Sequence, residues 1–433
     1  MAGIFGIVSN KDCVSDLFKG TFYLQHRAQD YCGLALHDKD TLRDYTHKGL
    51  IKQQFPKQFI KKLSGTSGIG CVADNRQPVS EFNRTGGTIT CFDGNLLNCH
   101  ALKDLLLKRG VTFSGYHTPE HVSDIVIVSK IIAEEIKYVY GIERLIGLIK
   151  GDFAIVSLTR DGIYAARGWG RKPLIVGHKD GSWAVASESV SFENLNIKIM
   201  GDVKPGEVVF LDRSGVCSII KFDLSPIKYC AFEWIYNAYP PSVIDQRSVV
   251  KVRMKVGQAL ARRYPVKADL VSPVPNSGRW HAIGYAQESN LPYVEVFTRY
   301  DYSDRSYTPT EQITREEEAK IKLLPIKSVI EDKRIVLVDD SIVRGTQTLN
   351  QVSRLKDLGA KEVHARIACP PLMSACRYGK TTRNNDVCIA RRMSIEDIKS
   401  KLELDSLGYA IVEDMELAIG RYKNELCLEC WAV

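Results

Sequence analysis

The sequence contains no long hydrophobic run, and its first residues lack a basic segment followed by an apolar stretch. A helix that crosses a membrane needs about 20 consecutive apolar residues, and a secretory signal needs a charged segment before its apolar core. We therefore expect no membrane span and no export, which leaves the cytoplasm as the default compartment.

The sequence also lacks internal repeats, low-complexity tracts and basic runs interleaved with aromatic residues. Such basic runs are typical of nucleic-acid-binding surfaces, so we expect no nucleic acid among the partners. The formal net charge of +8 suits an enzyme that binds a phosphorylated substrate. A chain of 433 residues is too long for one ordinary core, and a domain size of roughly 150 residues indicates two or three domains.

The 12 cysteines are scattered and lack the spacing of a secreted disulfide framework. Without export, their thiols are expected to stay reduced. One pair, Cys427 and Cys430, has a CxxC spacing, which suits a metal ion or a metal cluster.

Short strand-like segments separated by Gly, Asn and Asp fill the first half of the chain, interrupted by helical patterns at 100–109 and 123–138. This order, in which two helices separate two groups of strands, predicts an α+β layered domain of about 220 residues. Near residues 223–228 the pattern changes, and helical segments alternate with strongly apolar strands such as RIVLVDD and EVHARIA. That alternation predicts a parallel, doubly wound sheet whose ligands bind at the carboxyl ends of its strands.

The segment RIVLVDDSIVRGT at 334–346 carries the strongest functional signal. A buried strand delivers Asp339 and Asp340 to its carboxyl end, and a loop with hydroxyl groups and glycine opens the next helix near Gln347. Backbone N–H groups at a helix start bind anions, and adjacent carboxylates can hold Mg²⁺ or ribose hydroxyls. The alternative is an acid pair that only caps a helix, but strand, acid pair, loop and helix in this order favour a phosphate site.

This segment resembles the motif with which type I phosphoribosyltransferases bind phosphoribosyl pyrophosphate (PRPP), and segments over nearly the whole chain resemble glutamine amidophosphoribosyltransferases. The resemblance implies an α+β N-terminal-nucleophile-type sandwich at 1–225 and an α/β type I phosphoribosyltransferase domain at 226–395. A C-terminal helical segment follows at 396–433. The resemblance also implies that PRPP contacts the acid pair and the loop, namely Asp339, Asp340, Ser341, Val343, Arg344, Gly345 and Thr346.

A second segment, PVPNSGRWHAIGYA at 273–286, resembles the pyrophosphate loop of that family. In the family a serine and the two acids contact Mg²⁺, which implies Ser277, Asp339 and Asp340 as the PRPP- and magnesium-binding residues of this chain. Asn276 stands where the family usually has Asp, so one acidic contact is replaced by a polar one.

A third segment, at 299–323, resembles the family's flexible loop that closes over PRPP, with about two residues inserted around Tyr302. Arg299, Arg305 and Lys322 match its basic positions, and we expect Arg305 and Lys322 to act in catalysis. Breaking the bond from C1 of ribose to pyrophosphate creates a highly charged leaving group, which Mg²⁺ and a cationic lid stabilise. Closure of the lid also excludes water. The alternative is a loop whose cations are only solvated.

The first domain resembles the family's glutaminase through LQHRAQD, DGNLLN, ASES and RGWGRKPL. The family's nucleophile is an N-terminal cysteine, at whose place this chain has Ala2. Ala73 replaces an arginine that holds the substrate carboxylate, and Asp93 replaces an asparagine of the oxyanion hole. Loss of a nucleophile costs on the order of 10⁶ in turnover and loss of an oxyanion donor about 10²–10³. We therefore expect an inactive glutaminase.

Two further residues bear on this prediction. Asp124 corresponds to a family aspartate that binds the amine of glutamine. Cys71 lies inside a former substrate-binding segment, but an internal thiol lacks the terminal amine that serves as base. We do not expect it to replace the missing nucleophile.

Four cysteines occur in contexts that match the [4Fe–4S] ligands of cluster-bearing family members: Cys230, Cys376, Cys427 and Cys430. Four thiolates from three distant segments can hold such a cluster as a structural staple. A four-cysteine zinc site and buried free thiols are the alternatives.

The resemblance implies Mg²⁺-dependent transfer of a phosphoribosyl group from PRPP to ammonia, which yields 5-phosphoribosylamine for purine biosynthesis together with pyrophosphate. One alternative keeps the reaction and changes the acceptor to another small amine. Another is a non-catalytic regulator that binds PRPP or nucleotides and partners an active paralogue. Purine nucleotides are expected as regulatory ligands, and the chain is expected to form a homo-oligomer.

Overall fold

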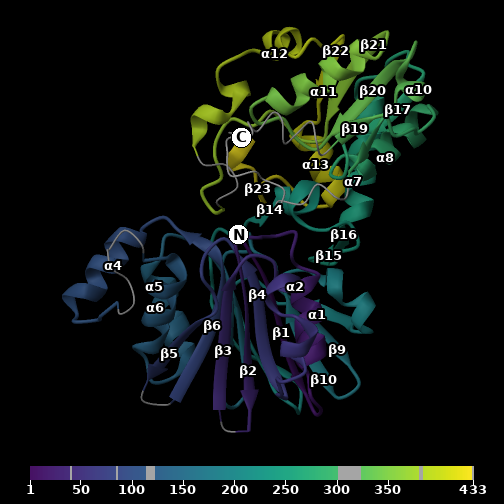
Figure 1. Ribbon diagram of the computed structural model, residues 1–433. Helices are drawn as coiled ribbons and strands as arrows, with labels where there is room; N and C mark the ends of the chain where they lie inside the picture. Colours follow the sequence, from purple (N-terminus) through teal and green to yellow (C-terminus); the bar gives the residue numbers. More distant parts are fainter. Residues whose placement is uncertain (40, 84–85, 114–121, 301–322, 380–383, 432–433) are drawn as a thin grey trace, which may run out of the picture. The chain divides into compact units, whose positions relative to one another are not determined.

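The computed structural model describes residues 1–39, 41–83, 86–113, 122–300, 323–379 and 384–431 (Figure 1). The chain divides into two compact units. The first comprises Met1–Cys230, Pro241–Gln246 and Arg377–Thr381, and the second comprises Ala231–Pro240, Arg247–Cys376 and Thr382–Val433. No helix in the described ranges is both long and apolar enough to cross a membrane.

The first unit contains a seven-stranded sheet whose neighbouring strands are antiparallel. Its order is β11-β9-β10-β1-β4-β2-β3. The strands are β1 (Ala2–Ser9), β2 (Tyr31–Asp38), β3 (Thr41–Lys48), β4 (Ser67–Ala73), β9 (Ile175–Lys179), β10 (Ser182–Ala186) and β11 (Lys198–Asp202). On this sheet packs α1 (Val14–Phe22), followed by the short helices α2 (Ile51–Gln54) and α3 (Lys57–Ile60).

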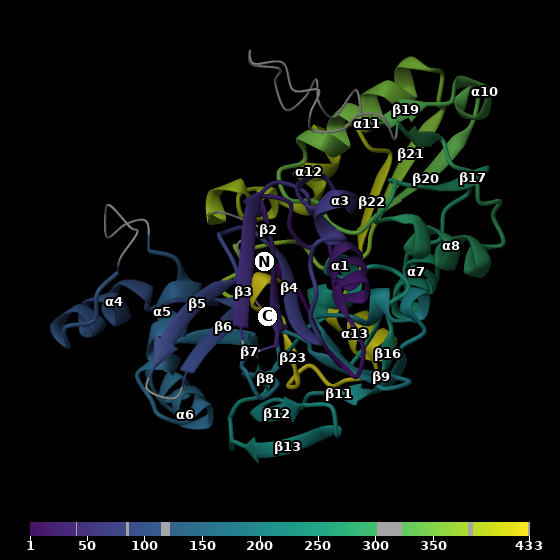
Figure 2. The same cartoon turned by 60° about the horizontal axis from the view of Figure 1, so that its bottom comes forward.

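A six-stranded antiparallel sheet forms the second layer of this unit. Its order is β13-β12-β8-β7-β6-β5, with β12 and β13 at the bottom of Figure 2. The strands are β5 (Val79–Asn83), β6 (Gly86–Leu96), β7 (Gly151–Leu158), β8 (Ile163–Arg167), β12 (Glu207–Leu211) and β13 (Val216–Lys221). Buried side chains from both sheets, among them Ile4, Ile69 and Val156, form one continuous core. The unit is therefore a two-sheet sandwich.

Three helices cover the other face of the six-stranded sheet: α4 (Cys99–Lys108), α5 (Asp124–Ala133) and α6 (Tyr138–Leu148). The prediction of one helix over 123–138 is wrong, because α5 ends at Ala133 and α6 begins at Tyr138. The break lets α6 fold back onto α5. Gly141 makes this approach possible, since a Cβ there would lie 2.6 Å from the carbonyl oxygen of Ile132.

The second unit is built on a four-stranded parallel sheet with the order β17-β20-β21-β22. Its strands are β17 (Leu270–Pro273), β20 (Arg334–Asp339), β21 (Glu362–Ile367) and β22 (Ser406–Tyr409). The parallel sheet predicted from the alternating pattern is thus confirmed. A separate antiparallel pair, β18 (Phe297–Arg299) and β19 (Leu323–Pro325), flanks residues 301–322.

Helices precede, connect and follow the parallel strands, as expected for a doubly wound sheet. They are α7 (Val249–Arg263), α8 (Arg279–Ser289), α10 (Lys327–Ile330), α11 (Thr346–Asp357), α12 (Ile395–Lys401) and α13 (Val412–Ile419). Short helical turns lie at Ser189–Ser191, Glu193–Leu195, Glu233–Asn237, Asn385–Val387, Ile389–Arg391 and Glu429–Trp431. Two-residue strands are β14 (Tyr229–Cys230), β15 (Val243–Ile244), β16 (Arg247–Ser248) and β23 (Leu426–Cys427).

Candidate functional site

The acid pair lies at the carboxyl end of β20, the strand between β17 and β21 in the second unit. The apolar residues 335–338 are buried, as expected for a strand of a parallel sheet, whose two faces are covered by helices. Asp339 ends the strand, and Asp340 follows it with only 5% of its surface exposed. The predicted place of the acid pair at this edge of the sheet agrees with the structure.

The acids and the two predicted serines form one hydrogen-bonded group. The Asp339 carboxylate accepts a hydrogen bond of 2.9 Å from the Asp340 amide and a long one of 3.5 Å from the Ser277 hydroxyl. The Ser341 hydroxyl donates to Asp340 at 2.6 Å. Burial and the adjacent charge of Asp340 raise the pKa of Asp339 well above its usual range. A bound cation relieves both effects, which suits the prediction of magnesium.

The loop after the acids leads directly into α11. Gly345 precedes this helix with φ of +81°, a left-handed conformation that glycine adopts without steric cost. Arg344 and Thr346 are exposed, and Val343 is half-buried with its carbonyl oxygen accepting from the Ile389 amide at 2.8 Å. The helix begins at Thr346, one residue before the predicted start. Its first turn therefore follows the acid pair closely enough to offer N–H groups to a phosphate.

The predicted pyrophosphate loop connects β17 to α8. Its Val274 amide donates to the carbonyl oxygen of Val338 at 2.8 Å. At Gly278 a Cβ would lie 2.3 Å from the same oxygen, so only glycine lets the loop lie this close to β20. That approach brings Ser277 to the acid pair. The peptide bond between Pro275 and Asn276 is cis, and Asn276 is exposed.

Two predicted catalytic residues, Arg305 and Lys322, lie outside the described residues. The third basic residue of that segment, Arg299, is the last residue of β18 and is exposed. The roles of the three cations stay predictions.

The three residues predicted to be altered glutaminase positions, Ala2, Ala73 and Asp93, lie together in the first unit. Ala2 and Ala73 are paired across β1 and β4, and both side chains are buried. The Ala2 amide donates to the Asp93 carboxylate at 2.9 Å. The sequence comparison therefore selected residues that the fold brings into one place.

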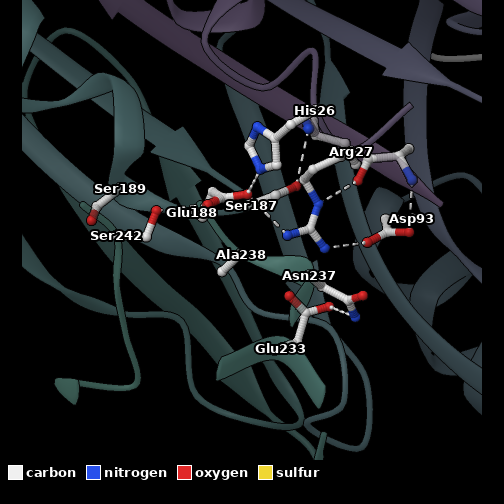
Figure 3. Close-up of polar contacts among 12 residues, drawn as sticks. His26, Arg27, Asp93, Ser187, Glu188, Ser189, Glu233, Asn237, Ala238 and Ser242 are labelled. Atoms are coloured by element: carbon white, nitrogen blue, oxygen red, sulfur yellow. Dashed lines mark hydrogen bonds and ion pairs between the residues drawn. The ribbon is translucent and has the colours of Figure 1, made fainter. Parts of the chain in front are cut away.

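Two buried cations, Lys172 and Arg27, hold the Asp93 carboxylate, and Figure 3 shows the contact from Arg27. Lys172 Nζ lies 3.2 Å from one oxygen, and Arg27 Nη2 lies 3.4 Å from the other. Burial alone raises the pKa of Asp93, but the charges of Lys172 and Arg27 outweigh it and lower that pKa to about 2. Asp93 is therefore negatively charged at neutral pH. Its oxygens accept hydrogen bonds, whereas the oxyanion hole that the resemblance predicts at this position would have to donate them.

Arg27 links Asp93 to a second buried carboxylate, Glu188 (Figure 3). Its Nη1 lies 3.1 Å from Glu188, and its Nε donates to the Ala2 carbonyl oxygen at 3.1 Å. Glu188 also bonds His26 Nε2 and the Ser242 hydroxyl, each at 2.6 Å. Burial raises the pKa of Glu188, but His26 and Arg27 lower it to about 2. Arg27, Lys172 and Glu188 lie in segments that resemble the family's glutaminase, but no role was predicted for these three residues.

The other two residues considered for glutamine chemistry, Asp124 and Cys71, are both buried in the first unit. Asp124 is buried, and its carboxylate accepts from the Leu96 amide at 3.1 Å. Cys71 has no exposed surface and belongs to the core between the two sheets. A thiol in this core is shielded from a polar substrate.

Three of the predicted cluster cysteines, Cys376, Cys427 and Cys430, belong to the second unit, and Cys230 belongs to the first. The Cys430 carbonyl oxygen accepts from the amides of residues 373 and 374 at 2.9 and 3.1 Å. Burial and the nearby thiols of Cys369, Cys376 and Cys427 raise the pKa of Cys430. Within the described ranges, no group of three or more His, Cys, Asp or Glu side chains is placed to hold a metal ion. The iron–sulfur cluster stays a prediction.

Residues 67–194 match the family model of the glutamine amidotransferase domain. The whole chain is similar to the amidophosphoribosyltransferase of Methanocaldococcus jannaschii, with 34% identity over 99% of this chain and 96% of the relative.

Two solved structures share the fold over 99% of this chain at 31% identity. One is a glutamine PRPP amidotransferase from B. subtilis complexed with ADP and GMP, with a TM-score of 0.91 and 96% of that chain covered. The other is described as the allosteric regulatory enzyme of purine biosynthesis, with a TM-score of 0.92 and 95% covered. These likenesses confirm the predicted fold class, an N-terminal-nucleophile-type sandwich followed by a type I phosphoribosyltransferase domain.

Proposed function

Because this chain belongs to the amidophosphoribosyltransferase family, we propose that it transfers the phosphoribosyl group of PRPP to free ammonia without hydrolysing glutamine. The products are 5-phosphoribosylamine and pyrophosphate. The observation that carries the proposal is a contrast between the two units. The acid pair, Ser277 and the helix-opening loop lie together in one unit, whereas buried charges fill the glutaminase site of the other.

In the proposed reaction, Asp339, Asp340 and Ser277 hold Mg²⁺ beside the pyrophosphate. Bound there, the cation neutralises charge on the leaving group. The loop from Ser341 to Thr346 binds the 5′-phosphate through its N–H groups and hydroxyls. Arg305 and Lys322 are proposed to stabilise the charged leaving group. Ammonia is a neutral nucleophile, so the protein has to position it but not deprotonate it before attack.

The glutaminase site supports the second half of the proposal. Ala2 offers a methyl group in place of a nucleophilic sulfur, and Ala73 offers no cation for the substrate carboxylate. Asp93 adds negative charge where an oxyanion would form, and its salt bridges to Lys172 and Arg27 keep it ionised. Three separate requirements of amide hydrolysis are therefore unmet, and restoring one of them leaves the other two.

We extend the proposal to the domain division at 1–225, 226–395 and 396–433 and to a [4Fe–4S] cluster on Cys230, Cys376, Cys427 and Cys430. Two of the other proposed ligands, Cys376 and Cys427, are close enough to Cys430 to raise the pKa of its thiol, which supports such a site. Purine nucleotides are proposed as regulatory ligands, because the similar B. subtilis enzyme was solved with ADP and GMP. A homo-oligomer in the cytoplasm is proposed as the working form.

A pyrophosphate-release assay with Mg²⁺ and PRPP tests the function directly. Ammonium chloride should support release, glutamine should not, and no glutamate should appear. The Ala2→Cys variant should also fail to form glutamate, since Ala73 and Asp93 remain. Glutamate release by the wild type contradicts the proposal. Release with a different amine but not with ammonia indicates the alternative acceptor, and PRPP binding without turnover for any amine indicates the regulator.

A further inference from the structure

A cation begins the helix that follows the predicted pyrophosphate loop. Arg279 is the first residue of α8 and lies two residues after Ser277, whose hydroxyl is 3.5 Å from the Asp339 carboxylate. Two residues span at most about 7 Å of chain. The backbone of Arg279 therefore lies beside the part of the loop that reaches the acid pair.

An extended segment after α8 carries the partner of this cation. In it, Tyr293 forms a parallel bridge with Val271 of β17, and the Val294 amide donates to the Val271 carbonyl oxygen at 2.9 Å. Because Tyr293 lies beside Val271, Glu295 is level with Pro273, the last residue of β17. The segment thus brings Glu295 to the carboxyl edge of the parallel sheet, which also carries the acid pair.

Glu295 holds the guanidinium group of Arg279 in a fixed orientation. Arg279 Nε lies 2.9 Å from one carboxylate oxygen of Glu295, and Nη2 lies 3.1 Å from the other. The Tyr293 hydroxyl donates to the same carboxylate at 2.8 Å. A guanidinium has five N–H groups, and Glu295 takes two of them. No described residue binds the other three, and 41% of the Arg279 side chain is exposed, so these groups are open to a ligand.

The charges around the loop favour an anion at this guanidinium group. In the proposed complex, the carboxylates of Asp339 and Asp340 offset the charge of Mg²⁺, so the negative charge of pyrophosphate needs further cations. The segment 273–279 contains Arg279 and no acidic residue. Arginine binds phosphate oxygens through two parallel hydrogen bonds, which suits it to this group better than lysine.

We propose that Arg279 binds the pyrophosphate group of PRPP and stabilises it as the leaving group, with Glu295 as the positioning residue that orients the guanidinium. The proposal rests on the proposed function, because it takes the loop before α8 as the pyrophosphate site. The alternative is an ion pair that only fastens the start of α8 to the neighbouring extended segment. In that case the two partners matter equally, and no ligand is involved.

Two ligands and two variants test this role by calorimetry. PRPP and ribose 5-phosphate share the sugar and the 5′-phosphate, but only PRPP carries pyrophosphate. Arg279→Met should weaken Mg²⁺-PRPP binding at least about tenfold, as expected when charge-assisted hydrogen bonds are lost. It should leave the affinity for ribose 5-phosphate unchanged. Glu295→Gln keeps the cation and an oxygen acceptor, so it should weaken Mg²⁺-PRPP binding by less than about threefold.

The structural alternative predicts a different result, because both variants break the same ion pair. Equal losses of PRPP affinity in Arg279→Met and Glu295→Gln overturn the proposal, and so does an unchanged affinity in Arg279→Met. Arg262→Met is the matched control. Arg262 pairs with Glu288 of the same helix at 2.9 Å, and loss of this ion pair should not change PRPP binding.

Turnover adds a measurement that a purely structural ion pair would not affect. Negative charge on the leaving group grows as its bond to C1 breaks, so Arg279→Met should also lower kcat at least about tenfold. A kcat at the wild-type level contradicts the role of Arg279 in stabilising the leaving group. Failure of the wild type to bind Mg²⁺-PRPP contradicts the proposed function instead, whereas wild-type binding that Arg279→Met retains contradicts only the role of Arg279.

Discussion

At the scale of single residues, Asp93 stands where the resemblance places an asparagine of the oxyanion hole, and the two side chains differ in their hydrogen-bonding chemistry. An asparagine in an oxyanion hole donates from its amide, whereas a carboxylate only accepts. A buried carboxylate is costly without partners, and here Lys172 and Arg27 supply them. Asp93, Lys172 and Arg27 are thus joined in a buried charge network that stabilises the fold.

The pKa of Asp93 makes stability dependent on pH. The pKa is about 2 in the folded protein, below the ordinary value near 4. The ionised group therefore contributes about 2 kcal/mol at neutral pH, which is lost as the pH falls from about 4 through 2. Asp93→Asn should lower the free energy of unfolding by about 3–5 kcal/mol at pH 7, because two buried cations lose their partner. The difference from the wild type should shrink by about 2 kcal/mol near pH 2.

Urea unfolding at several pH values checks this prediction. Exposed Asp161 provides the control, and Asp161→Asn should change the unfolding free energy by less than about 0.5 kcal/mol. A constant difference between Asp93→Asn and the wild type from pH 7 to pH 2 contradicts the assigned ion pairs.

At the scale of elements, the phosphate loop and the helix α11 depend on the conformation of two glycines. Gly345 precedes the helix with φ of +81°, and Gly359 follows it with φ of +90°. Alanine in such a conformation costs about 1–2 kcal/mol, so both Gly345→Ala and Gly359→Ala should destabilise the protein. Only Gly345→Ala should also weaken Mg²⁺-PRPP binding, by about tenfold, since a shift of the loop by 1 Å disturbs the phosphate contacts.

Calorimetric titration of the two glycine variants measures this difference. Gly359 serves as the matched control, because it has the same backbone conformation at the opposite end of α11. Equal loss of affinity in both variants would place the PRPP phosphate away from this loop.

Some of these elements could be predicted from the sequence and others could not. The apolar run before Asp339 predicted a buried parallel strand, because a strand that is buried on both faces consists almost entirely of apolar residues. The end of α5 at Ala133 was not predictable, since it depends on how α6 packs back onto α5, where Gly141 approaches the carbonyl group of Ile132. The charge network was missed for a similar reason. Its members come from four separate segments, and no local pattern predicts that Arg27, Lys172 and Glu188 converge near Asp93.

At the scale of the whole molecule, the proposed cluster would tie the C-terminal segment to residues far away in the sequence. Anaerobically purified protein should be brown and contain about four irons per chain. Cys427→Ser should lose iron and lower the unfolding midpoint, because metal binding and folding are coupled. The exposed residue Cys217 offers the control, and Cys217→Ser should keep its iron. Colourless protein with one zinc per chain would contradict the cluster.

The central claim is that the acid pair holds Mg²⁺-PRPP for catalysis, and the double variant Asp339→Asn/Asp340→Asn tests it most directly. Asparagine keeps the size of the side chains and caps helices about as well as aspartate, but it removes two charges beside the cation. Calorimetry of PRPP binding, with and without Mg²⁺, should be combined with the pyrophosphate-release assay on the same protein. Asp332→Asn, an exposed change in the same unit, is the control.

The account predicts that the double variant binds PRPP more weakly, loses the Mg²⁺ dependence of binding, and loses at least about 10³ in turnover, as expected when catalytic electrostatic contacts are removed. Asp332→Asn should behave like the wild type. Binding and turnover that stay unchanged in the double variant would contradict the account, since they would show that the active site lies elsewhere.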